Sequence, residues 1–516
     1  MLHRYLKAGH NVKGVSNVLS NQCTLDEALQ ELKEMNLTFL PAGTPPPNPS
    51  EMLSQPQMQA MVNTLREKFD VVIFDAPPVS VVTDAAVIGR YVDGAVDVIY
   101  RTMAECHLTH DEGPDVGGPV APYIQSQRRD TYGKYAELLV EKGGAYYCFC
   151  EKAESEEDSG EFDRAADPCR DMPLDEAMKR VEAGEPYVIR QKIPTEGTTT
   201  FHDAIFGDIT VENSTLDDQV LLKRDGLPTY NFANVIDDHL MGITHVVRGS
   251  EYLSSAPKYD LLYHAFGWEV PTYVHCSPVM RDAQNKMSKR HGDPSYEDLK
   301  AQGYLTEAIL NYVALLGWSP KGEYAEQEIF SLAELTKVFD MTGISKSPAI
   351  FDIAKLDHFN AVYLRAMEPA AFAKVAEPYI RQSVKGDFDI AAIAGLLQAR
   401  CEKLTEIPEK VDFFDACPEY GIDFFTNKKS KTNPEVCKTM LEAAIPMLEQ
   451  LPDWTTDAIH DSLIALAEQL GVKNATLMWP VRIAAAGKLV TPGGAVEICQ
   501  ILGRDETLRR LKAGLA

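Results

Sequence analysis

The sequence lacks any hydrophobic run long enough to cross a bilayer, and its first residues do not form a secretory signal. Basic residues are also scarce: 50 lysines and arginines face 76 aspartates and glutamates, which gives a formal net charge of −26. That balance argues against a protein that binds nucleic acid over its whole surface through phosphate neutralisation. We therefore expect a cytoplasmic, globular protein with no membrane partner, in which any basic contact surface is local.

Cysteines are few as well. Ten cysteines in 516 residues are too scattered for a disulfide framework. Only Cys148 and Cys150, with Cys169 downstream, have a spacing that indicates a metal site. Internal repeats and low-complexity tracts are absent. At about 100–200 residues per domain, the length predicts about three or four domains.

The apolar pattern changes near residue 300. Before it, helical and strand patterns alternate: residues 128–142 predict an amphipathic helix, 144–149 a short strand, and 227–249 a strand, a helix and a second strand. After it, the periodicity is almost purely helical. The clearest helical patterns cover 304–317, 369–382 and 388–404. The sequence therefore predicts an α/β part followed by an all-α part.

Within the first hundred residues, an aspartate follows an apolar strand pattern. In VVIFDAPP (71–78), Asp75 stands where a Walker B residue holds Mg²⁺ through water beside a nucleotide. Together with the proline-rich block PAGTPPPNPSEML (41–53), this pattern resembles the ATPase domain of bacterial tyrosine kinases that control capsule and exopolysaccharide chain length. The resemblance covers residues 1–95 and implies a truncated P-loop-type α/β fragment.

That fragment has no phosphate-binding loop to serve Asp75. The sequence contains no G-x-x-x-x-G-K-[ST], whose backbone N–H groups and lysine would hold the β- and γ-phosphates of a nucleotide. We therefore interpret the Walker B aspartate as vestigial and the fragment as inert. The competing hypothesis is a nucleotide-dependent regulator of polysaccharide export.

A basic motif, N-K-M-S-K-R, occupies residues 285–290. Two lysines three residues apart, with a serine between them, can fold over a triphosphate and neutralise the charge that develops as pyrophosphate leaves. A second basic cluster consists of Lys428, Lys429 and Lys431. From composition alone, each stretch is more often a solvated loop than a binding site, so the surrounding sequence must decide.

Longer matches favour triphosphate binding over a solvated loop for the N-K-M-S-K-R motif. Residues 229–268, beginning TYNFANVIDDHLMG, and residues 286–318 closely resemble the second half of a class I glutamyl-tRNA synthetase catalytic domain. Residues 110–150 resemble the stretch after that family's first βαβ half, and residues 477–511 the end of its helical anticodon-binding region. The resemblance covers about residues 94–516. Glutaminyl-tRNA synthetases share the basic loop but end in β-barrels, so the helical C-terminal pattern separates the two.

The resemblance implies how the chain is divided. A truncated Rossmann-type class I catalytic domain would cover residues 96–295, with a connective insertion at about 146–225. A stem-contact region would follow at 296–365, and a helical anticodon-binding region at 366–516. The fold class implied is therefore α/β followed by all-α.

The resemblance also implies roles for single residues. Tyr230, Asn234 and Arg248 would bind glutamate, the arginine by forking onto a substrate carboxylate. Glu251 would contact the ribose or adenine of ATP. The catalytic triphosphate loop would contain Lys286, Ser288 and Lys289, with Lys289 also binding ATP. Without the family resemblance, an ordinary strand-to-helix turn with a capping amide would explain Tyr230 and Asn234 better.

The spaced cysteines match the place where some members of this family hold a structural zinc. Cys148, Cys150, Cys169 and Asp171 would supply three thiolates and a carboxylate to a tetrahedral site. Zinc-containing members usually have a histidine two residues after the third cysteine, where this chain has Asp171. Zinc and no zinc therefore both remain open from the sequence.

The opening motifs of the family are missing from the 516 residues. None of the twelve histidines begins an H-[IVL]-G sequence, and no R-I-E-D-T-D-like acidic motif occurs. Residues 91–103 (YVDGAVDVIYRTM) fit both resemblances, so we interpret the chain as a chimera joined there.

The expected substrates are glutamate, ATP with Mg²⁺, and tRNA-Glu, with tRNA-Gln as a further acceptor in some bacteria. Because the opening motifs are missing, we expect no measurable aminoacylation. The alternative function is that of a non-catalytic tRNA-binding protein.

Overall fold

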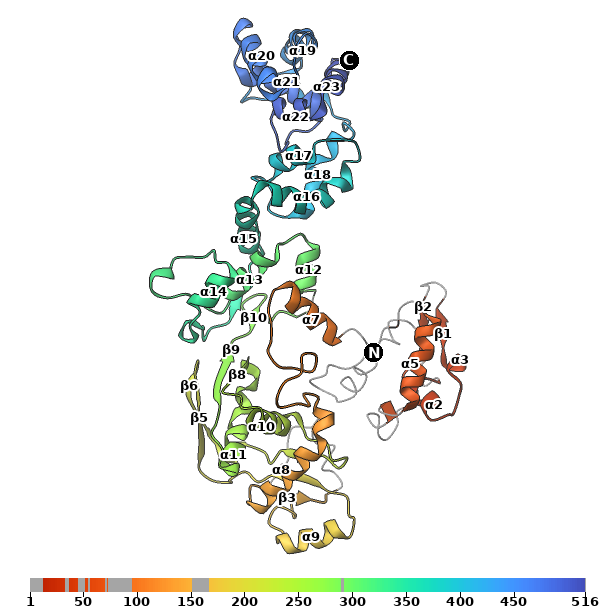
Figure 1. Cartoon of the computed structure of the whole chain (residues 1–516), viewed down its shortest axis with the longest axis vertical. Helices are drawn as coiled ribbons and strands as arrows, with labels where there is room; N and C mark the ends of the chain where they lie inside the picture. The colour runs from red at the N-terminus through yellow and green to blue at the C-terminus, as the bar shows by residue number, and fades with distance from the viewer. Residues whose placement is uncertain are drawn as a thin grey trace. The chain divides into compact units, whose positions relative to one another are not determined.

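The chain forms two compact units, Met1–Thr109 and His110–Ala516 (Figure 1). This computed structural model describes residues 13–32, 37–44, 52–53, 56–69, 72, 95–150, 167–288 and 292–515. Asp75 and the strand expected around it lie outside the described residues, so the kinase-like expectation for this segment stays a prediction.

The first unit is built around one helix, α5 (Pro56–Lys68). Its apolar residues recur at helical spacing, so they share one face and bury it. The buried side chains there are Leu19, Met58, Met61, Val62 and Leu65. The other described elements are α2 (Val15–Leu19), α3 (Leu25–Ala28), the antiparallel strands β1 (Gln30–Leu32) and β2 (Leu37–Phe39), and α7 (Ala95–Glu105).

The second unit begins with α/β structure. A four-stranded sheet has the order β6-β5-β9-β8. Strands β5 (Thr198–Asp203) and β6 (Gly207–Glu212) form an antiparallel hairpin, whereas β8 (His245–Gly249) and β9 (Thr272–Cys276) are parallel and β9 also pairs in parallel with β5. Helices α10 (Tyr230–Leu240) and α11 (Ala256–Phe266) lie close to these strands (Figure 1).

A second sheet in this part is antiparallel and has the order β3-β4-β7. Its strands are β3 (Ala145–Cys148), β4 (Val188–Gln191) and β7 (Val220–Leu222). Two more helices accompany the sheet, α8 (Arg129–Glu141) and α9 (Leu174–Glu182). One apolar core joins α8, α10, α11 and both sheets, and its fully buried residues include Tyr132, Phe232, Leu262 and Tyr273.

The local predictions in this part are mostly confirmed. The helix and strand expected at 128–142 and 144–149 are α8 and β3, and the helix and second strand expected within 227–249 are α10 and β8. The first strand expected in that segment is wrong. Strand β7 ends at Leu222, and Leu227 only closes a turn by accepting from the Lys223 N–H. Asp225 and Gly226 form that turn, with Gly226 in the left-handed region at φ 77°.

Beyond residue 292 the described chain is almost entirely helical. One short strand remains, β11 (Ala349–Ile350), which pairs in parallel with β10 (Val279–Met280). The helices are α12 (Tyr296–Ala301), α13 (Thr306–Leu315), α14 (Leu332–Val338), α15 (Ile353–Ala366), α16 (Pro369–Ser383), α17 (Ile390–Leu397), α18 (Ile407–Val411), α19 (Pro434–Glu449), α20 (Thr456–Gln469), α21 (Asn474–Ala486), α22 (Ala495–Leu502) and α23 (Arg504–Ala513).

A continuous core runs from α15 to α23. The helices expected at 304–317 and 369–382 are confirmed as α13 and α16. The one expected at 388–404 is too long, because α17 ends at Leu397. Cys401 and Leu404 keep the apolar spacing and remain buried, but they do so outside the helix. Among the described residues, no helix is long and apolar enough to cross a membrane.

Candidate active site and thiol cluster

Two neighbouring parallel strands begin the candidate site. In the register of β8 and β9, Arg248 is directly paired with His275, so their side chains extend from the same face of the sheet. The Arg248 Nε donates to the His275 Nε2 over 3.2 Å. The sequence predicted Arg248 as a site residue but gave no reason to select His275.

Three tyrosine rings surround the guanidinium of Arg248. Its Cζ lies 4.7 Å from the ring centroid of Tyr259, 5.0 Å from that of Tyr252 and 5.4 Å from that of Tyr273. Ring faces attract a cation at such distances without forming hydrogen bonds to it. The arginine Nη2 is buried and has no hydrogen-bond partner among the described residues.

Asn234 on α10 is a neighbour of Tyr259, one of these three tyrosines. Burial raises the pKa of Tyr259, while the charge of Arg248 and a hydrogen bond with Asn234 both act to lower it. The Tyr259 hydroxyl itself donates to the Asn231 Oδ1 over 2.5 Å. The Asn234 Oδ1 is a second buried atom with no hydrogen-bond partner in the described chain. Tyr230, one helical turn earlier on α10, is 57% exposed, and its ring centroid lies 5.8 Å from that of Tyr252.

Asp238 is an acidic neighbour that the sequence analysis missed. It follows Asn234 by four residues on α10, a spacing that puts both on one helix face. Burial raises the pKa of its carboxyl to about 6, although the charge of Arg248 acts in the opposite direction. The adjacent Asp237 is instead bonded to Arg128 and Tyr132. The i, i+4 spacing from Asn234 was the signal that could have selected Asp238.

The basic loop after β10 is anchored at its base. The Met280–Lys286 pair forms an antiparallel bridge, and Asp282 caps the turn by accepting from the backbone N–H groups of Gln284 and Asn285. These hydrogen bonds lower the pKa of Asp282, the side-chain bond to Asn285 contributing most. The loop therefore leaves the sheet from a fixed hairpin.

Lys286, expected in the catalytic triphosphate loop, lies here beside Glu251, which is expected to contact ATP. The Lys286 Nζ lies 3.8 Å from the Glu251 Oε1, and both side chains are exposed. The backbone N–H of Ser288 donates to the Asp293 carboxylate over 2.7 Å, and that carboxylate also pairs with Arg281 at 3.1 Å. Lys289 lies outside the described residues.

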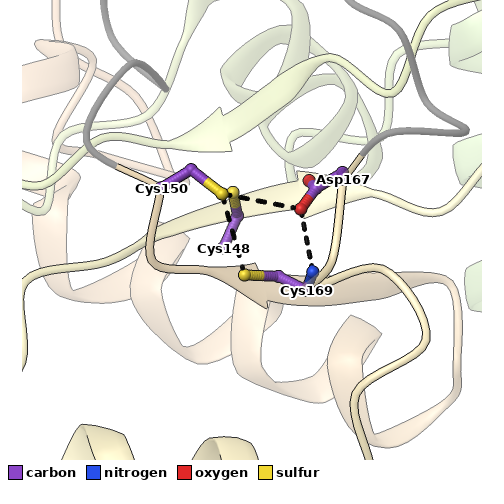
Figure 2. A group of neighbouring side chains, drawn as sticks. All are labelled: Cys148, Cys150, Asp167 and Cys169. Atoms are coloured by element: carbon purple, nitrogen blue, oxygen red, sulfur yellow. Dashed lines mark hydrogen bonds between the residues drawn. The ribbon is translucent and has the colours of Figure 1, made fainter.

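A group of thiols and one carboxylate forms a separate site (Figure 2). The ligand atoms of Cys148, Cys150, Asp167 and Cys169 all lie within 4.8 Å of one another. The Cys150 Sγ is 3.9 Å from the Cys169 Sγ and 3.7 Å from the Asp167 Oδ1. Burial raises the pKa of both Cys148 and Cys150.

The carboxylate in this cluster corrects the sequence analysis. Asp171, expected as the fourth ligand, is 86% exposed and pairs with Lys192 at 3.2 Å. Asp167 occupies the expected place instead. Its Oδ1 accepts from the backbone N–H of Cys169 at 2.9 Å, and its Oδ2 accepts from the Tyr146 hydroxyl at 3.0 Å. The sequence analysis selected Asp171, two residues after Cys169, whereas the carboxylate beside the thiols belongs to Asp167, two residues before it.

Comparison with known proteins gives consistent matches. The family "tRNA synthetases class I (E and Q), catalytic domain" matches residues 83–358, and "Anticodon binding domain" matches residues 371–515. The glutamate–tRNA ligase of Clostridium tetani is 53% identical over 83% of this chain and 88% of its own length. That of Clostridium botulinum strain Hall is 54% identical over the same shares. The chain belongs to the glutamate–tRNA ligase family.

A solved ligase agrees with this assignment. The crystal structure of a glutamate tRNA ligase from Elizabethkingia meningosepticum in complex with its amino acid superposes with a TM-score of 0.72. It is 33% identical and covers 83% of this chain and 90% of that one. The members of this family are enzymes, and the function of the family, ligation of glutamate to tRNA, is the main prediction made from the sequence.

Proposed function

We propose that the side chains around Tyr259 form the glutamate-binding pocket of this ligase. The observation that carries the proposal is a pair of buried atoms, Arg248 Nη2 and Asn234 Oδ1, that have no hydrogen-bond partner among the described residues. A buried polar atom without a hydrogen bond costs about 1–3 kcal/mol, so proteins rarely retain one unless a ligand satisfies it. One of these atoms needs an acceptor and the other a donor, and an amino acid supplies both as its carboxylate and its ammonium group.

ATP would bind on the side of Glu251 and the basic loop. Glu251 would contact the ribose or adenine, while Lys286, Ser288 and Lys289 would fold over the triphosphate. The exposed pair between Lys286 and Glu251 supports this role, because such surface pairs contribute only about 0–1 kcal/mol and leave the lysine available to a phosphate. Mg²⁺ bound with ATP would neutralise phosphate charge.

The chemistry of this ligase would follow in two steps. A glutamate carboxylate oxygen would attack the α-phosphorus of ATP, forming glutamyl-adenylate and releasing pyrophosphate. The terminal adenosine of tRNA would then attack the activated carbonyl and release AMP. The ammonium groups of the basic loop would stabilise the charge that develops on the leaving pyrophosphate.

For tRNA, we assign residues 296–365 to stem contact and residues 366–516 to anticodon binding, after a catalytic part at 96–295 with its insertion at about 146–225. The match of an anticodon-binding family to residues 371–515 supports the last assignment. Bases splayed from an anticodon loop are read by stacking and edge hydrogen bonds, which an acidic protein can supply. The tRNA partner is tRNA-Glu, with tRNA-Gln as a further acceptor.

The thiol cluster would hold a structural zinc. Ligands at about 2.3 Å from a tetrahedral zinc place two sulfurs about 3.8 Å apart, and the Cys150 to Cys169 distance of 3.9 Å fits this geometry. The Asp167 carboxylate would be the fourth ligand, held by the Tyr146 hydroxyl at 3.0 Å. Bound zinc would draw the protons from the thiols and stabilise the fold around β3.

The 516-residue chain would nevertheless bind its substrates without completing the reaction. The sequence contains no H-[IVL]-G motif and no acidic partner motif, which together stabilise ATP phosphates and contact the amino group in this family. The kinase-like resemblance of residues 1–95 supports a chimeric origin. The second candidate function is therefore a tRNA-binding protein without catalysis.

Calorimetric titration of the full chain with L-glutamate tests the pocket. We expect saturable binding, and we expect Arg248→Lys to weaken it at least about tenfold, because lysine cannot present two parallel donors to a carboxylate. Arg509→Lys is the matched control, since Arg509 is an exposed arginine far along the sequence on α23. Equal affinity of the Arg248→Lys variant and the unmodified chain would contradict the proposal.

A further inference from the structure

A buried histidine and a buried aspartate lie on β9 and β5, the next two strands of the sheet after the one that carries Arg248. His275 and Asp203 are both 0% exposed, and the His275 Nδ1 lies 2.7 Å from the Asp203 Oδ2. Asp203 is the last residue of β5 and pairs with Tyr273 of β9, two residues before His275. The sheet register therefore places Asp203, His275 and Arg248 on one face of three adjacent strands, with Asp203 offset from His275 by two residues.

The hydrogen bonds define the protonation of the histidine. Arg248 can only donate, so the His275 Nε2 that receives its Nε must carry a lone pair. The single ring proton is then on Nδ1 and is donated to Asp203. Burial lowers the pKa of His275, which keeps the ring neutral, as this arrangement requires.

Asp203 is itself held in place. Its Oδ1 accepts from the backbone N–H groups of Ile205 and Phe206, at 2.9 and 2.8 Å, and its Oδ2 accepts from the backbone N–H of His275 at 3.1 Å. A carboxylate with this many donors keeps a single orientation. Its position fixes the ring plane of His275.

We propose that Asp203 and His275 are positioning residues, which orient the guanidinium of Arg248 for a substrate carboxylate. The inference rests on the glutamate pocket proposed above. The three tyrosine rings attract the cation but supply no directional bond, so they leave the guanidinium free to turn within its plane. The bond from Nε to His275 fixes that rotation and directs Nη2 to the position where it has no protein partner.

A purely structural role for this pair predicts a different result on mutation. If His275 only held Asp203 and the end of β5, a substitution that retains the donor to Asp203 would preserve glutamate affinity. If His275 orients Arg248, the acceptor at the Nε2 position is the group that matters. Asparagine at position 275 can retain the donor near Nδ1, whereas glutamine can retain an acceptor near Nε2.

Glutamate affinity of full-length variants separates these roles. We expect His275→Asn to weaken binding about tenfold, the loss typical of a hydrogen bond to a charged group, and His275→Gln to weaken it no more than about threefold. His202→Gln is the matched control: His202 also pairs with an aspartate, Asp208, at 2.7 Å, but both side chains are exposed. We expect this control to bind like the unmodified chain. Circular dichroism and thermal unfolding of each variant report whether it is folded.

Nitrogen-15 NMR of the histidines provides a readout that does not require glutamate. We expect the His275 resonances, identified by their loss in His275→Gln, to show a neutral ring with the proton on Nδ1 at neutral pH. In Arg248→Lys the Nε2 resonance should shift, because its donor is removed. A proton on Nε2, or a charged ring, would overturn the proposal even if His275→Asn failed to fold.

The outcomes distinguish this inference from the pocket on which it rests. If Arg248→Lys loses affinity while His275→Asn does not, the pocket stands and the positioning role is wrong. If His275→Gln is the weaker binder of the two variants, the role of His275 is structural. If the unmodified chain binds no glutamate, or Arg248→Lys binds normally, the proposed pocket itself is wrong and the positioning role is wrong with it.

Discussion

Two arginines in this molecule show how differently a buried cation can be used. Arg510 on α23 is 2% exposed, and its donors reach the Glu506 carboxylate and the carbonyl oxygens of Phe413, Phe414 and Ala485 at 2.6–2.9 Å. Within the described part of the chain, the side chain of Arg248 on β8 has one hydrogen bond, contacts three tyrosine rings and has a buried Nη2 without a partner. The donors of Arg510 thus find their acceptors within the protein, whereas Arg248 Nη2 finds none among the described residues.

The same contrast extends to the parts of the chain that hold them. The helical part from α15 to α23 has a continuous apolar core, and Arg510 ties three of its segments together. The part around β8 and β9 collects the buried polar atoms Arg248 Nη2, Asn234 Oδ1 and Tyr263 OH, none of which has a partner in the described chain. Buried polar atoms without a partner among the described residues therefore gather at the candidate ligand site, whereas the helical part contains one, Thr432 Oγ1.

The largest effect is expected at the thiol cluster. Its cysteines differ from both arginines because a bound metal ion would be their partner. Purified protein should contain about one zinc per chain, and Cys150→Ser should remove it, because three ligands of one tetrahedral site cannot retain the metal as tightly. Metal analysis after purification without chelator measures this.

The matched pair Asp167→Asn and Asp171→Asn sharpens this test. Only the first should weaken zinc binding, since Asp171 pairs with Lys192 at the surface. Zinc loss from Asp171→Asn alone would contradict the ligand set, and absence of zinc from the unmodified protein would contradict the site.

A smaller effect is expected from removing the satisfied arginine. Arg510→Ala should lower the free energy of unfolding by about 3–5 kcal/mol, because three buried carbonyl oxygens and a carboxylate lose their donor. Arg509→Ala is the control: this neighbour bonds the same Glu506 but is 64% exposed, so its loss should cost less than about 1 kcal/mol. Urea unfolding compares them, and equal losses would show that burial of Arg510 does not matter.

The smallest effect concerns pH. Hydrogen bonds from Arg509 and then Arg510 lower the pKa of Glu506 to about 2, so its contribution to stability is present above about pH 4.5 and is lost as the pH falls toward 2. Glu506→Gln should therefore be less stable than the unmodified chain by about 2 kcal/mol near pH 6, with the gap closing below about pH 4. A gap that stays constant with pH would rule out the charged carboxylate as its cause.

Sequence patterns predicted helices and strands better than they predicted contacts between side chains. The helices α8, α10, α13 and α16 followed from apolar periodicity, because that periodicity directly reports which helix face is buried. The end of α17 did not, since residues after a helix can keep the same apolar spacing while the backbone turns away.

Site residues depended on the same distinction. Arg248 and Asn234 were selected through a recognisable motif, whereas His275 and Asp203 were not, because only the pairing of β5, β9 and β8 brings them together. Asp167 was missed for a related reason: the choice between two nearby aspartates depends on the path of the loop before Cys169, which spacing does not reveal.

Aminoacylation and tRNA binding, measured on one preparation with the same purified tRNA-Glu, test the central claim most directly. We expect the chain to bind tRNA-Glu in a filter assay with an affinity within about tenfold of that of the Clostridium tetani ligase. We expect aminoacylation to be at least about 10⁴-fold slower, because each missing transition-state stabiliser costs about 10²–10³-fold. Turnover within tenfold of that ligase would contradict the claim that the chain binds its substrates without completing the reaction.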